Sequence, residues 1–243
     1  MRVAIASDIH GNRQAFEAVI AAAEADGADE LWCLGDLVGY GAEPDACVAL
    51  ADAHCAICLA GNHDLAVVEV LSLDDFSRGA ALAAYWTREV IRPETRQYLL
   101  SLKPQSAAEG LGLFHASPRD PVWEYVLSAL AAELCFDATD FRISFIGHSH
   151  VALSFHRPEG EPATGTTRRE GADVDLATGE WLINPGSVGQ PRDGDPRAAW
   201  LVLDTDAMTA TWRRAEYDIG AAQAAIRAAN LPDSLAERLQ YGQ

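Results

Sequence analysis

Short apolar runs alternate with amphipathic segments through the first 150 residues of the chain. Five runs have the length of buried strands, and they cover residues 2–7, 31–35, 56–61, 112–117 and 143–149. Other segments carry apolar residues at helical spacing, and they cover residues 12–29, 43–54, 77–102 (with a break near Pro93) and 121–137. Strands that alternate with helices predict a layered α/β domain.

The pattern changes after residue 150. Three strand-rich segments follow without intervening helices, and they cover residues 151–158, 172–184 and 198–218. The stretches "ATGEW" and "DTDAMTATW" predict hairpin turns, so we expect a second, more antiparallel sheet packed against the first. Residues 157–173 are rich in Gly, Pro, Glu and Thr and predict an exposed loop. From Asp218 onward the pattern is helical, with a break at Pro232.

Polar side chains follow each of the first five strands where the strand ends. They stand in Asp8-Ile9-His10, Gly35-Asp36, Gly61-Asn62-His63-Asp64, His115 and Gly147-His148-Ser149-His150. Because α/β sheets bind ligands at the carboxyl ends of their strands, we expect these groups at one edge. Residues two apart, such as Asp8 and His10, point to the same side of an extended chain and can reach one site.

The chemistry of these side chains indicates a metal centre. Carboxylate, amide and imidazole groups together suit Mn, Fe, Zn or Co, and no cysteine joins the set. A single Asp-x-His pair is common in exposed turns and proves little. Five of the seven histidines fall in these groups, however, and only His54 and His156 lie elsewhere. A structural role for all five histidines at strand ends is much harder to justify than a shared ion.

Composition limits the partners. The chain has 243 residues, 49% of them hydrophobic, which is enough for the core of one large domain. Its formal net charge of -18 disfavours broad binding of nucleic acid, although bound cations still permit a small anionic substrate. The first apolar run ends at Asp8, too early for a signal peptide, and no stretch approaches the ~20 apolar residues of a membrane span. We therefore expect a cytoplasmic protein, and its oligomeric state stays open, a homo-oligomer included.

The five cysteines do not predict a disulfide framework, because their number is odd and their spacing is wide. Cys55 and Cys58 form a C-x-x-C motif, but it lies in a strand-like stretch and has no second motif to complete a zinc site. We interpret all five as reduced, structural thiols.

The motifs D-x-H, G-D, G-N-H-D, "HASP" and G-H-x-H, in this order, resemble those of the calcineurin-like metallophosphoesterases. They span residues 8–150, and residues 183–204 are similar to the small prokaryotic YfcE-like phosphodiesterase branch. The resemblance implies a four-layer α/β/β/α sandwich of two mixed sheets flanked by helices. We expect one domain over residues 1–243, with a helical, insertion-like segment at about 65–107.

The resemblance also implies a role for each motif residue. Asp8, His10 and His150 bind a first metal ion, Asn62, His115 and His148 bind a second, and Asp36 bridges the two. His63 is similar to the family's non-ligand histidine, which protonates the leaving oxygen or neutralises its charge. Either Asp64 or Asp36 orients His63. The implied reaction is hydrolysis of small phosphodiesters or nucleotides by a hydroxide held between two transition-metal ions.

Substrate contacts are less defined. Asn12, near a predicted helix start, either donates to a phosphate oxygen or only caps the helix. Arg119, Arg192 and Arg197 are candidate anion contacts, although each is also explained as surface charge. Phe76, Tyr85, Trp86 and Tyr98 form either an aromatic wall beside the site or, as their helical spacing favours, part of the core.

Three alternative functions follow from the same residues. The protein phosphatases of the superfamily carry an arginine after their G-D motif, and "GDLVGYG" has Tyr40 near that place, which disfavours this activity. A phosphomonoesterase or a dinucleoside-polyphosphate hydrolase fits the ligand set as well as a phosphodiesterase does. A non-catalytic, metal-holding scaffold for protein binding is the alternative outside enzymology. Scaffold relatives tend to lose ligands, whereas every ligand position is filled here.

Overall fold

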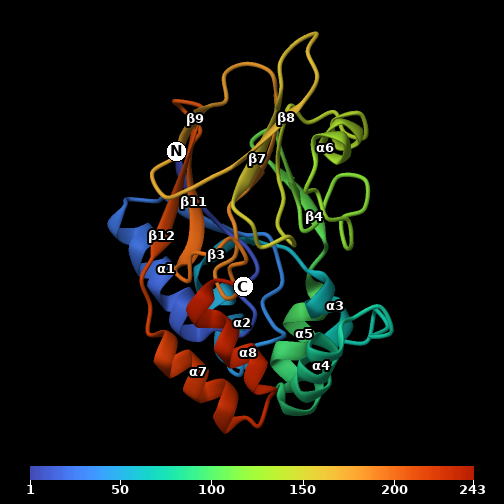
Figure 1. Ribbon diagram of the computed structural model, residues 1–243, viewed down its shortest axis with the longest axis vertical. Coiled ribbons are helices and arrows are strands. Elements are labelled where there is room, and N and C mark those ends of the chain that lie inside the picture. Colours follow the sequence, from blue (N-terminus) through green and yellow to red (C-terminus); the bar gives the residue numbers. More distant parts are fainter.

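Two six-stranded sheets, A and B, pack face to face in the computed structural model, which describes residues 1–243 (Figure 1). The strands of sheet A are β1 (Arg2–Ala6), β2 (Glu30–Cys33), β3 (Cys55–Cys58), β9 (Asp173–Asp175), β11 (Ala198–Asp204) and β12 (Thr209–Ala215). The strands of sheet B are β4 (Gln105–Ala108), β5 (Leu111–Phe114), β6 (Ile143–Phe145), β7 (Leu153–Arg157), β8 (Thr164–Thr167) and β10 (Glu180–Asn184). Their orders are β3-β2-β1-β11-β12-β9 and β4-β5-β6-β10-β7-β8.

Helices cover the outer face of each sheet and close one end of the molecule (Figure 1). Sheet A is covered by α1 (Arg13–Ala25) and α2 (Pro44–His54), and sheet B by α6 (Ala129–Phe136). The helices at the closed end are α3 (Asn62–Val67), α4 (Arg78–Val90), α5 (Pro93–Ser101), α7 (Ile219–Ala228), α8 (Asp233–Glu237) and the 3₁₀ helix η1 (Arg238–Tyr241). The arrangement is the predicted four-layer sandwich.

Strand β1 shows how the residue pattern produces these layers. Val3 and Ile5 point into the core between the two sheets, whereas Ala4 and Ala6 point outward into the core beneath α1. Because successive side chains of a strand alternate between faces, a run that is apolar throughout is buried on both. Small alanines on the outer face leave room for Phe16 of α1, which is fully buried.

The prediction that the second half forms its own antiparallel sheet is wrong. Both sheets are mixed: β1 is parallel to β2 and antiparallel to β11, and β10 is parallel to β6 and antiparallel to β7. The "DTDAMTATW" turn does join the hairpin β11–β12, but the "ATGEW" turn does not join a hairpin. It passes from β9 in sheet A to β10 in sheet B. Local turn chemistry does not reveal which sheet a strand will join.

Three further boundaries differ from the prediction. Residues 121–128 are not helical, because α6 begins only after Ser128, whose hydroxyl caps the helix through the amide of Ala131. The predicted loop 157–173 contains the exposed edge strand β8, which pairs with β7. Asn62 does not end a strand but begins α3. The insertion-like segment at 65–107 does hold the helices α4 and α5.

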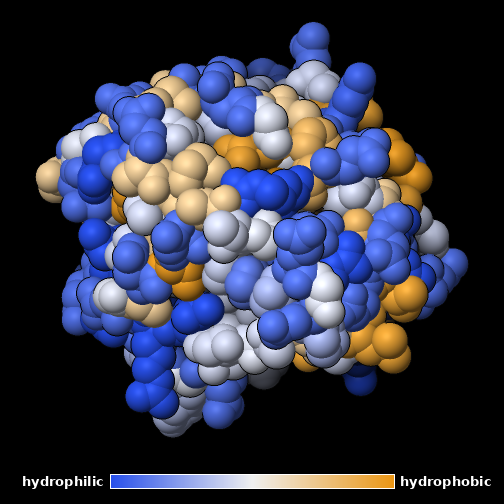
Figure 2. All heavy atoms as spheres, turned by 90° about the horizontal axis from the view of Figure 1, so that it is seen from above, coloured by the Kyte–Doolittle hydropathy of each residue, from blue (hydrophilic) through white to orange (hydrophobic).

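The surface agrees with the composition. The face seen in Figure 2 is mostly hydrophilic, with apolar side chains in scattered areas. All five cysteines are free thiols, and Cys33, Cys47 and Cys135 are buried. Measured against the thickness of a bilayer, every helix is too short or too polar to cross it.

Candidate metal centre

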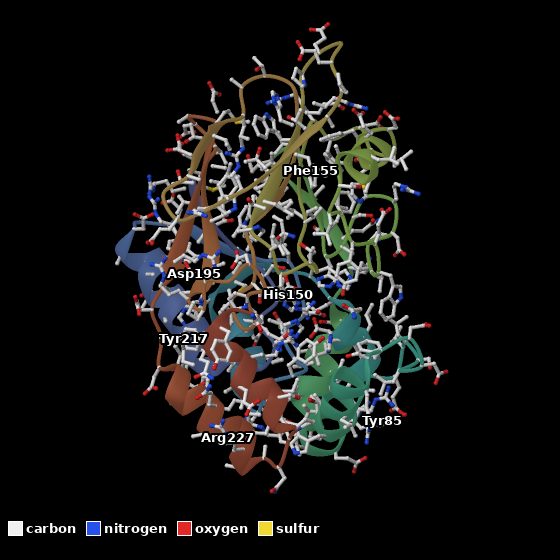
Figure 3. The ribbon with its side chains drawn as sticks, in the orientation of Figure 1. Tyr85, His150, Phe155, Asp195, Tyr217 and Arg227 are labelled. Carbon is white, nitrogen blue, oxygen red and sulfur yellow. The ribbon has the colours of Figure 1, made fainter.

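The predicted strand-end residues converge on one place near the middle of the molecule, where His150 is labelled in Figure 3. The segments that follow β1, β2, β3, β5 and β6 all contribute to it. Hydrogen bonds between main chains join these segments directly, from Asp8 N to Gly35 O (3.0 Å) and from Gly147 N to His115 O (2.7 Å). The carboxyl ends of strands from both sheets therefore form one site.

One group consists of Asp8, His10, Asp36 and His150, whose ligand atoms all lie within 4.8 Å of one another. The Nε2 atoms of His10 and His150 are 3.0 Å apart. Oδ1 of Asp8 lies 3.5 Å from Nε2 of His150, and Oδ2 of Asp36 lies 3.6 Å from Nε2 of His10. All four side chains are buried, so an ion placed among them is shielded from solvent.

A second group shares Asp36 with the first. It contains Asp36, His115 and His148, again with ligand atoms within 4.8 Å. Oδ2 of Asp36 is 3.6 Å from Nε2 of His115, the same distance as from Nε2 of His10. Asn62 lies beside this group, with Oδ1 3.2 Å from Nε2 of His115. One carboxylate oxygen of Asp36 thus faces both groups.

Hydrogen bonds to the main chain fix the orientation of the imidazoles. The Nδ1 atoms of His10, His115 and His150 bond to carbonyl oxygens of Val38 (3.1 Å), Leu34 (2.9 Å) and Gln190 (2.7 Å). A carbonyl can only accept, so each Nδ1 carries the proton and each Nε2 keeps its lone pair. This tautomer turns three ring nitrogens inward as metal donors.

One oxygen of each carboxylate accepts a hydrogen bond from a main-chain amide, which fixes the orientation of the side chain. Oδ2 of Asp8 accepts the amide of His148 (3.1 Å), and Oδ1 of Asp36 accepts the amide of His63 (2.9 Å). The other oxygens, Oδ1 of Asp8 and Oδ2 of Asp36, are buried without a hydrogen-bond partner, as is Nε2 of His148. Leaving a buried polar atom unpaired costs about 1–3 kcal/mol, and more for a charged group. Cations among these atoms remove that cost, so the residues fit a pair of metal ions.

Burial shifts the protonation of the site in the direction that metal binding needs. It lowers the pKa of His10, His148 and His150 well below 6.5, and neighbouring histidines lower it further, so the rings are neutral. Burial also raises the pKa of Asp8 to about 7 and that of Asp36 well above its usual range. Charged carboxylates are therefore unfavourable here until a cation stabilises them.

The backbone of the site is strained. Residues with left-handed φ angles are Asp8 (56°), His10 (51°), Asp36 (55°), Tyr40 (55°), His148 (62°) and His150 (59°). Such angles cost non-glycine residues of the order of 1 kcal/mol each and persist only where surrounding structure imposes them. They let each short strand-end loop turn its side chain back toward the common centre.

The segment after β10 forms hydrogen bonds with two of these strand-end loops. Nδ2 of Asn184 donates to the carbonyl of Gly147 (2.7 Å), and the hydroxyl of Ser187 donates to the carbonyl of Asp8 (2.8 Å). The amide of Gly189 donates to the same carbonyl (2.9 Å). Residues 184–189 therefore hold the first and the fifth strand-end loops together.

His63 lies next to the two groups without joining either. Its ring packs against those of His10 (centroids 4.8 Å apart), Tyr40 (4.5 Å) and Phe76 (5.0 Å), and its buried Nδ1 has no hydrogen-bond partner. Burial, followed by the charge of Arg192, lowers the pKa of His63 to about 3, so the ring is neutral in the absence of an anion.

Neither candidate acid orients the His63 ring by a hydrogen bond. The oxygens of Asp64 accept the amides of Val38 (3.1 Å) and Gly61 (2.9 Å), and Asp36 reaches only the main-chain amide of His63. Asp64 is fully buried and ties the loop after β2 to the start of α3. Its observed contacts are those of a residue that positions the loops.

A cavity of about 320 Å³ opens beside the metal ligands. Asp36, Asn62, His63, His148 and His150 form its inner wall. Aromatic residues line another part, namely Phe76, Trp123 and Tyr125, with the Tyr125 ring 4.1 Å from that of His148. Of the aromatic residues predicted as a wall or as core, only Phe76 lines the cavity. Tyr85 is exposed and lies at the periphery (Figure 3), and Trp86 and Tyr98 pack against apolar clusters.

Arg192 is the one predicted anion contact at the cavity. It donates from Nη2 to the Tyr40 hydroxyl (3.3 Å) and to Gln190 (3.1 Å), and its amide donates to the carbonyl of His150 (3.1 Å). Arg119 pairs with Glu124 at the surface, and Arg197 pairs with Asp195 and Glu170, so both are placed as surface charge.

Asn12 takes the role of a helix cap. Its Oδ1 accepts the amide of Ala15 (3.1 Å), and its Nδ2 donates to the carbonyl of Gly189 (3.0 Å). Both ends of the amide are occupied, and Asn12 does not line the cavity beside the metal ligands. The capping alternative is thus the one that its contacts support.

Seven cavity residues had no role assigned from the sequence, namely Tyr40, Asp75, Ser77, Ala80, Trp123, Tyr125 and Arg238. Tyr40 stands in "GYG", where the flanking glycines signal a turn, and its backbone is left-handed in the structure. Trp123 and Tyr125 were hidden by the helix predicted for residues 121–137. Arg238 lies in a helical tail, 46 residues after Arg192, and nothing local in the sequence marks it.

The chain is similar to proteins of a known family. The family model described as the calcineurin-like phosphoesterase superfamily domain matches residues 1–208. An uncharacterized protein of Methanocaldococcus jannaschii is 38% identical over 247 residues, covering 99% of this chain and 98% of its own.

Solved structures give a consistent result. A metallophosphoesterase from Sphaerobacter thermophilus is 43% identical, with a TM-score of 0.90 over 100% of this chain and 99% of its own. A hypothetical protein from Pyrococcus horikoshii OT3 shares the fold at 17% identity, with a TM-score of 0.79 over 100% of this chain and 98% of its own. Residues 209–243, which lie beyond the family model, are thus covered by both of these structures.

Proposed function

Because the chain belongs to the calcineurin-like phosphoesterase superfamily, a metal-dependent family of hydrolases, we propose that it hydrolyses small phosphodiesters or nucleotides at a two-metal centre. The observation that carries the proposal is the position of Asp36. Its Oδ2 is buried and unpaired, and it lies 3.6 Å from Nε2 of both His10 and His115. A carboxylate oxygen between two groups of neutral donors is suited to bridge two cations.

The ligands follow from the two groups. Asp8, His10 and His150 would hold one ion, Asn62, His115 and His148 would hold the other, and Asp36 would be common to both. No thiol reaches the site, which favours ions of the Mn, Fe, Zn or Co class. When bound, two such ions would supply Lewis acidity and would lower the pKa of a bound water to about 7.

His63 is placed to assist the leaving group. Its ring lines the cavity and is not needed as a ligand, and its pKa is low while the cavity holds no anion. A phosphoryl group beside the ring offsets the charge of Arg192 and raises the pKa of His63. Substrate binding and protonation of His63 are therefore coupled, and the proton is available when the leaving oxygen develops charge.

Arg192 and Tyr40 position the phosphoryl group. The main chain of Arg192 is tied to that of His150, and its guanidinium is steered by the Tyr40 hydroxyl. The guanidinium of Arg192 bonds to the uncharged side chains of Tyr40 and Gln190, which leaves its charge for an anion in the cavity. The rings of Phe76 and Trp123 line the same cavity in an edge-to-face pair with centroids 5.2 Å apart, which suits a substrate that carries a base or an aryl group.

A panel of substrates tests the proposal. The metal-stripped protein is reloaded with Mn²⁺, Co²⁺, Zn²⁺ or Fe²⁺, and hydrolysis of phosphodiesters, phosphomonoesters and dinucleoside polyphosphates is compared. We expect turnover of at least one class that depends on the added metal. If the protein binds metal stoichiometrically but hydrolyses none of the three classes, the non-catalytic scaffold becomes the better hypothesis.

A further inference from the structure

Two arginines far apart in the sequence, Arg192 and Arg238, line the same cavity as the metal ligands. Arg192 follows β10, whereas Arg238 begins η1 and lies beyond the residues matched by the family model. Figure 1 shows the C-terminal end of the chain near the middle of the molecule, close to the place where Figure 3 labels His150. The C-terminal helices thus contribute a charged group to the site.

Arg192 and Arg238 are the only two arginines that line this cavity. Many other arginines of the chain pair with carboxylates, as Arg214 does with Asp193 and Arg157 with Glu180. Neither Arg192 nor Arg238 pairs with a side-chain carboxylate, and Nε of Arg192 is buried without a partner.

Both guanidiniums are held in place by hydrogen bonds within the chain. Arg238 donates from Nε to the main-chain oxygen of Gln243, and Arg192 is held by Tyr40 and Gln190. Burial lowers the pKa of Arg238, and the like charge of Arg192 lowers it further, so the two cations repel each other in an empty cavity. An anion between them converts this repulsion into two attractions.

The charge of the cavity indicates which anion fits. The acids that line it are Asp36, which faces the metal ions, and Asp75, which is exposed at the rim. Two divalent ions and two guanidiniums therefore outweigh the carboxylates of the site, with Asp8 included. A diester phosphate carries one negative charge, whereas a terminal phosphoryl group carries nearly two at neutral pH.

We infer that Arg192 and Arg238 form an anion subsite that favours a terminal, doubly charged phosphoryl group over the singly charged phosphate of a diester. The inference rests on the proposed function and, of the two substrate classes proposed there, favours nucleotides that end in a phosphomonoester over phosphodiesters, in agreement with the aromatic residues Phe76 and Trp123 of the cavity. Arg238 is a specificity-determining residue in this account, supplied by a segment that the family model does not contain.

The test compares two ligands that differ by one charge and resist cleavage of their P–C bond. Phenylphosphonate is doubly charged at pH 8.5, and its monomethyl ester is singly charged. Binding of each to the metal-loaded protein is measured by titration calorimetry, with metal content checked for every variant. We expect the wild type to bind the doubly charged ligand at least about tenfold more tightly, the factor that corresponds to one charged hydrogen bond.

Matched variants locate the effect. Arg238→Gln should weaken binding of phenylphosphonate about tenfold and bring it close to that of the ester. Arg192→Gln, outside the C-terminal segment, should reduce the same discrimination. Arg227→Gln removes an equal charge from α7, where Arg227 pairs with Asp233 at the surface (Figure 3), and should change neither affinity. Thermal denaturation establishes that the variants are folded.

Two results overturn the inference: a wild type that binds both ligands equally, or a folded Arg238→Gln variant that discriminates as the wild type does. Either result leaves the proposed function intact if metal-dependent hydrolysis of diesters is observed. Conversely, discrimination that depends on Arg238 in a protein without hydrolytic activity supports the anion subsite and removes the phosphoesterase proposal.

Discussion

The Nε2 atoms of His10 and His150 face each other at 3.0 Å although the residues are 140 positions apart. Each ring is locked by an Nδ1 bond to a carbonyl, of Val38 and of Gln190, so both Nε2 atoms present lone pairs. Two lone pairs at this distance repel, and the repulsion ends when a cation or a proton lies beside them. Burial lowers the pKa of both histidines, which favours the cation.

Removal of metal should therefore affect stability as well as activity. Stripped protein should lose phosphoester hydrolysis and unfold at a lower temperature, and Mn²⁺ or a similar ion should restore both. Saturation at about 100 times Kd adds about 2.7 kcal/mol to the free energy of unfolding for each independent site. Calorimetry and activity assays of the same sample check this. Full activity in excess chelator, after verified removal, would falsify the metal requirement.

The shared position of Asp36 leads to a sharper prediction. Asp36→Asn keeps an oxygen that can accept the amide of His63 but removes the negative charge between the two groups. We expect the variant to lose at least one of two bound ions, because the cations then repel each other without a bridging charge. His54→Gln, at the end of α2, serves as the control and should keep its metal. An Asp36→Asn protein with two tightly bound ions, measured by elemental analysis, would remove the bridging role.

His63 should contribute to rate and not to metal binding. In His63→Ala both ions should remain, because the ring belongs to neither ligand group and its main-chain amide still donates to Asp36. General acid help is worth about 10²–10⁴ in rate, and it matters most for a basic leaving group. The variant should lose that factor on an alkyl or nucleoside ester and much less on a p-nitrophenyl ester.

The measurement is kcat/KM for both esters in the wild type and in His63→Ala, with metal content determined. Equal losses on the two substrates argue against the acid role. Loss of an ion makes His63 a ligand and requires a different assignment of the second group.

Stability should depend on pH through Asp45, which anchors α5 to the start of α2. Asp45 accepts hydrogen bonds from Thr95 Oγ1 (2.5 Å), from the amide of Arg92 (3.0 Å) and from its Nε (3.2 Å). Partial burial raises the pKa of Asp45, but these bonds outweigh it and hold the pKa below its ordinary value. A lowered folded-state pKa gives stability above about pH 4 that is lost as the pH falls through the folded value.

Asp45→Asn should therefore reduce the free energy of unfolding by about 1 kcal/mol at pH 7 and by much less near pH 3. Asp52→Asn in the same helix is the control, because Asp52 is exposed. This substitution should change the free energy of unfolding little at either pH. Urea unfolding at the two pH values measures the difference. A cost that stays constant with pH means that packing, and not the charge of Asp45, holds α5.

The metal ligands could be predicted from the sequence because each comes within five residues of the end of a strand. Parallel strands of an α/β sheet place their carboxyl ends at one edge, so Asp8 and Asp36, which follow the paired strands β1 and β2, had to meet once the strands were recognised. His115 follows β5 of the other sheet, and its meeting with them depends on how the two sheets pack. The sheet to which each strand belongs could not be predicted from the sequence in this way. Nothing local in Glu180–Asn184 says that β10 inserts between β6 and β7, because pairing depends on residues 23 or more positions away.

The substrate cavity was the least predictable part. Trp123 lies in a segment that has helical spacing, yet Ser128 caps α6 later in the chain and leaves residues 121–128 irregular. Arg238 follows α8, and the helices α4, α7 and α8 share one apolar cluster that contains Ala83, Ile226 and Leu235. Such long-range packing has no local signature in the sequence.

Gly61 offers a test of how closely the loops around the ligands approach one another. Its φ of -96° suits any residue, so backbone conformation does not require glycine here. A Cβ at this position, however, would lie 1.9 Å from Oδ1 of Asp36 and 2.6 Å from its main-chain nitrogen. Rotation of the Asp36 side chain cannot relieve the clash with the main chain, so Gly61→Ala must push the loops after β2 and β3 apart.

We expect Gly61→Ala to lose metal affinity and to unfold at a lower temperature, with a cost of about 1–3 kcal/mol that is typical of overpacking. Gly79→Ala in α4 is the matched control, because its added Cβ meets only Leu235 Cδ2 at 3.8 Å, an ordinary contact. That variant should be neutral or up to about 1 kcal/mol more stable, since alanine favours a helix over glycine. Metal titration and thermal denaturation of the two variants give the comparison. If Gly61→Ala keeps wild-type affinity for both ions, the close approach of Gly61 to Asp36 is not what fixes the bridging carboxylate, and its hydrogen bond from His63 must do so alone.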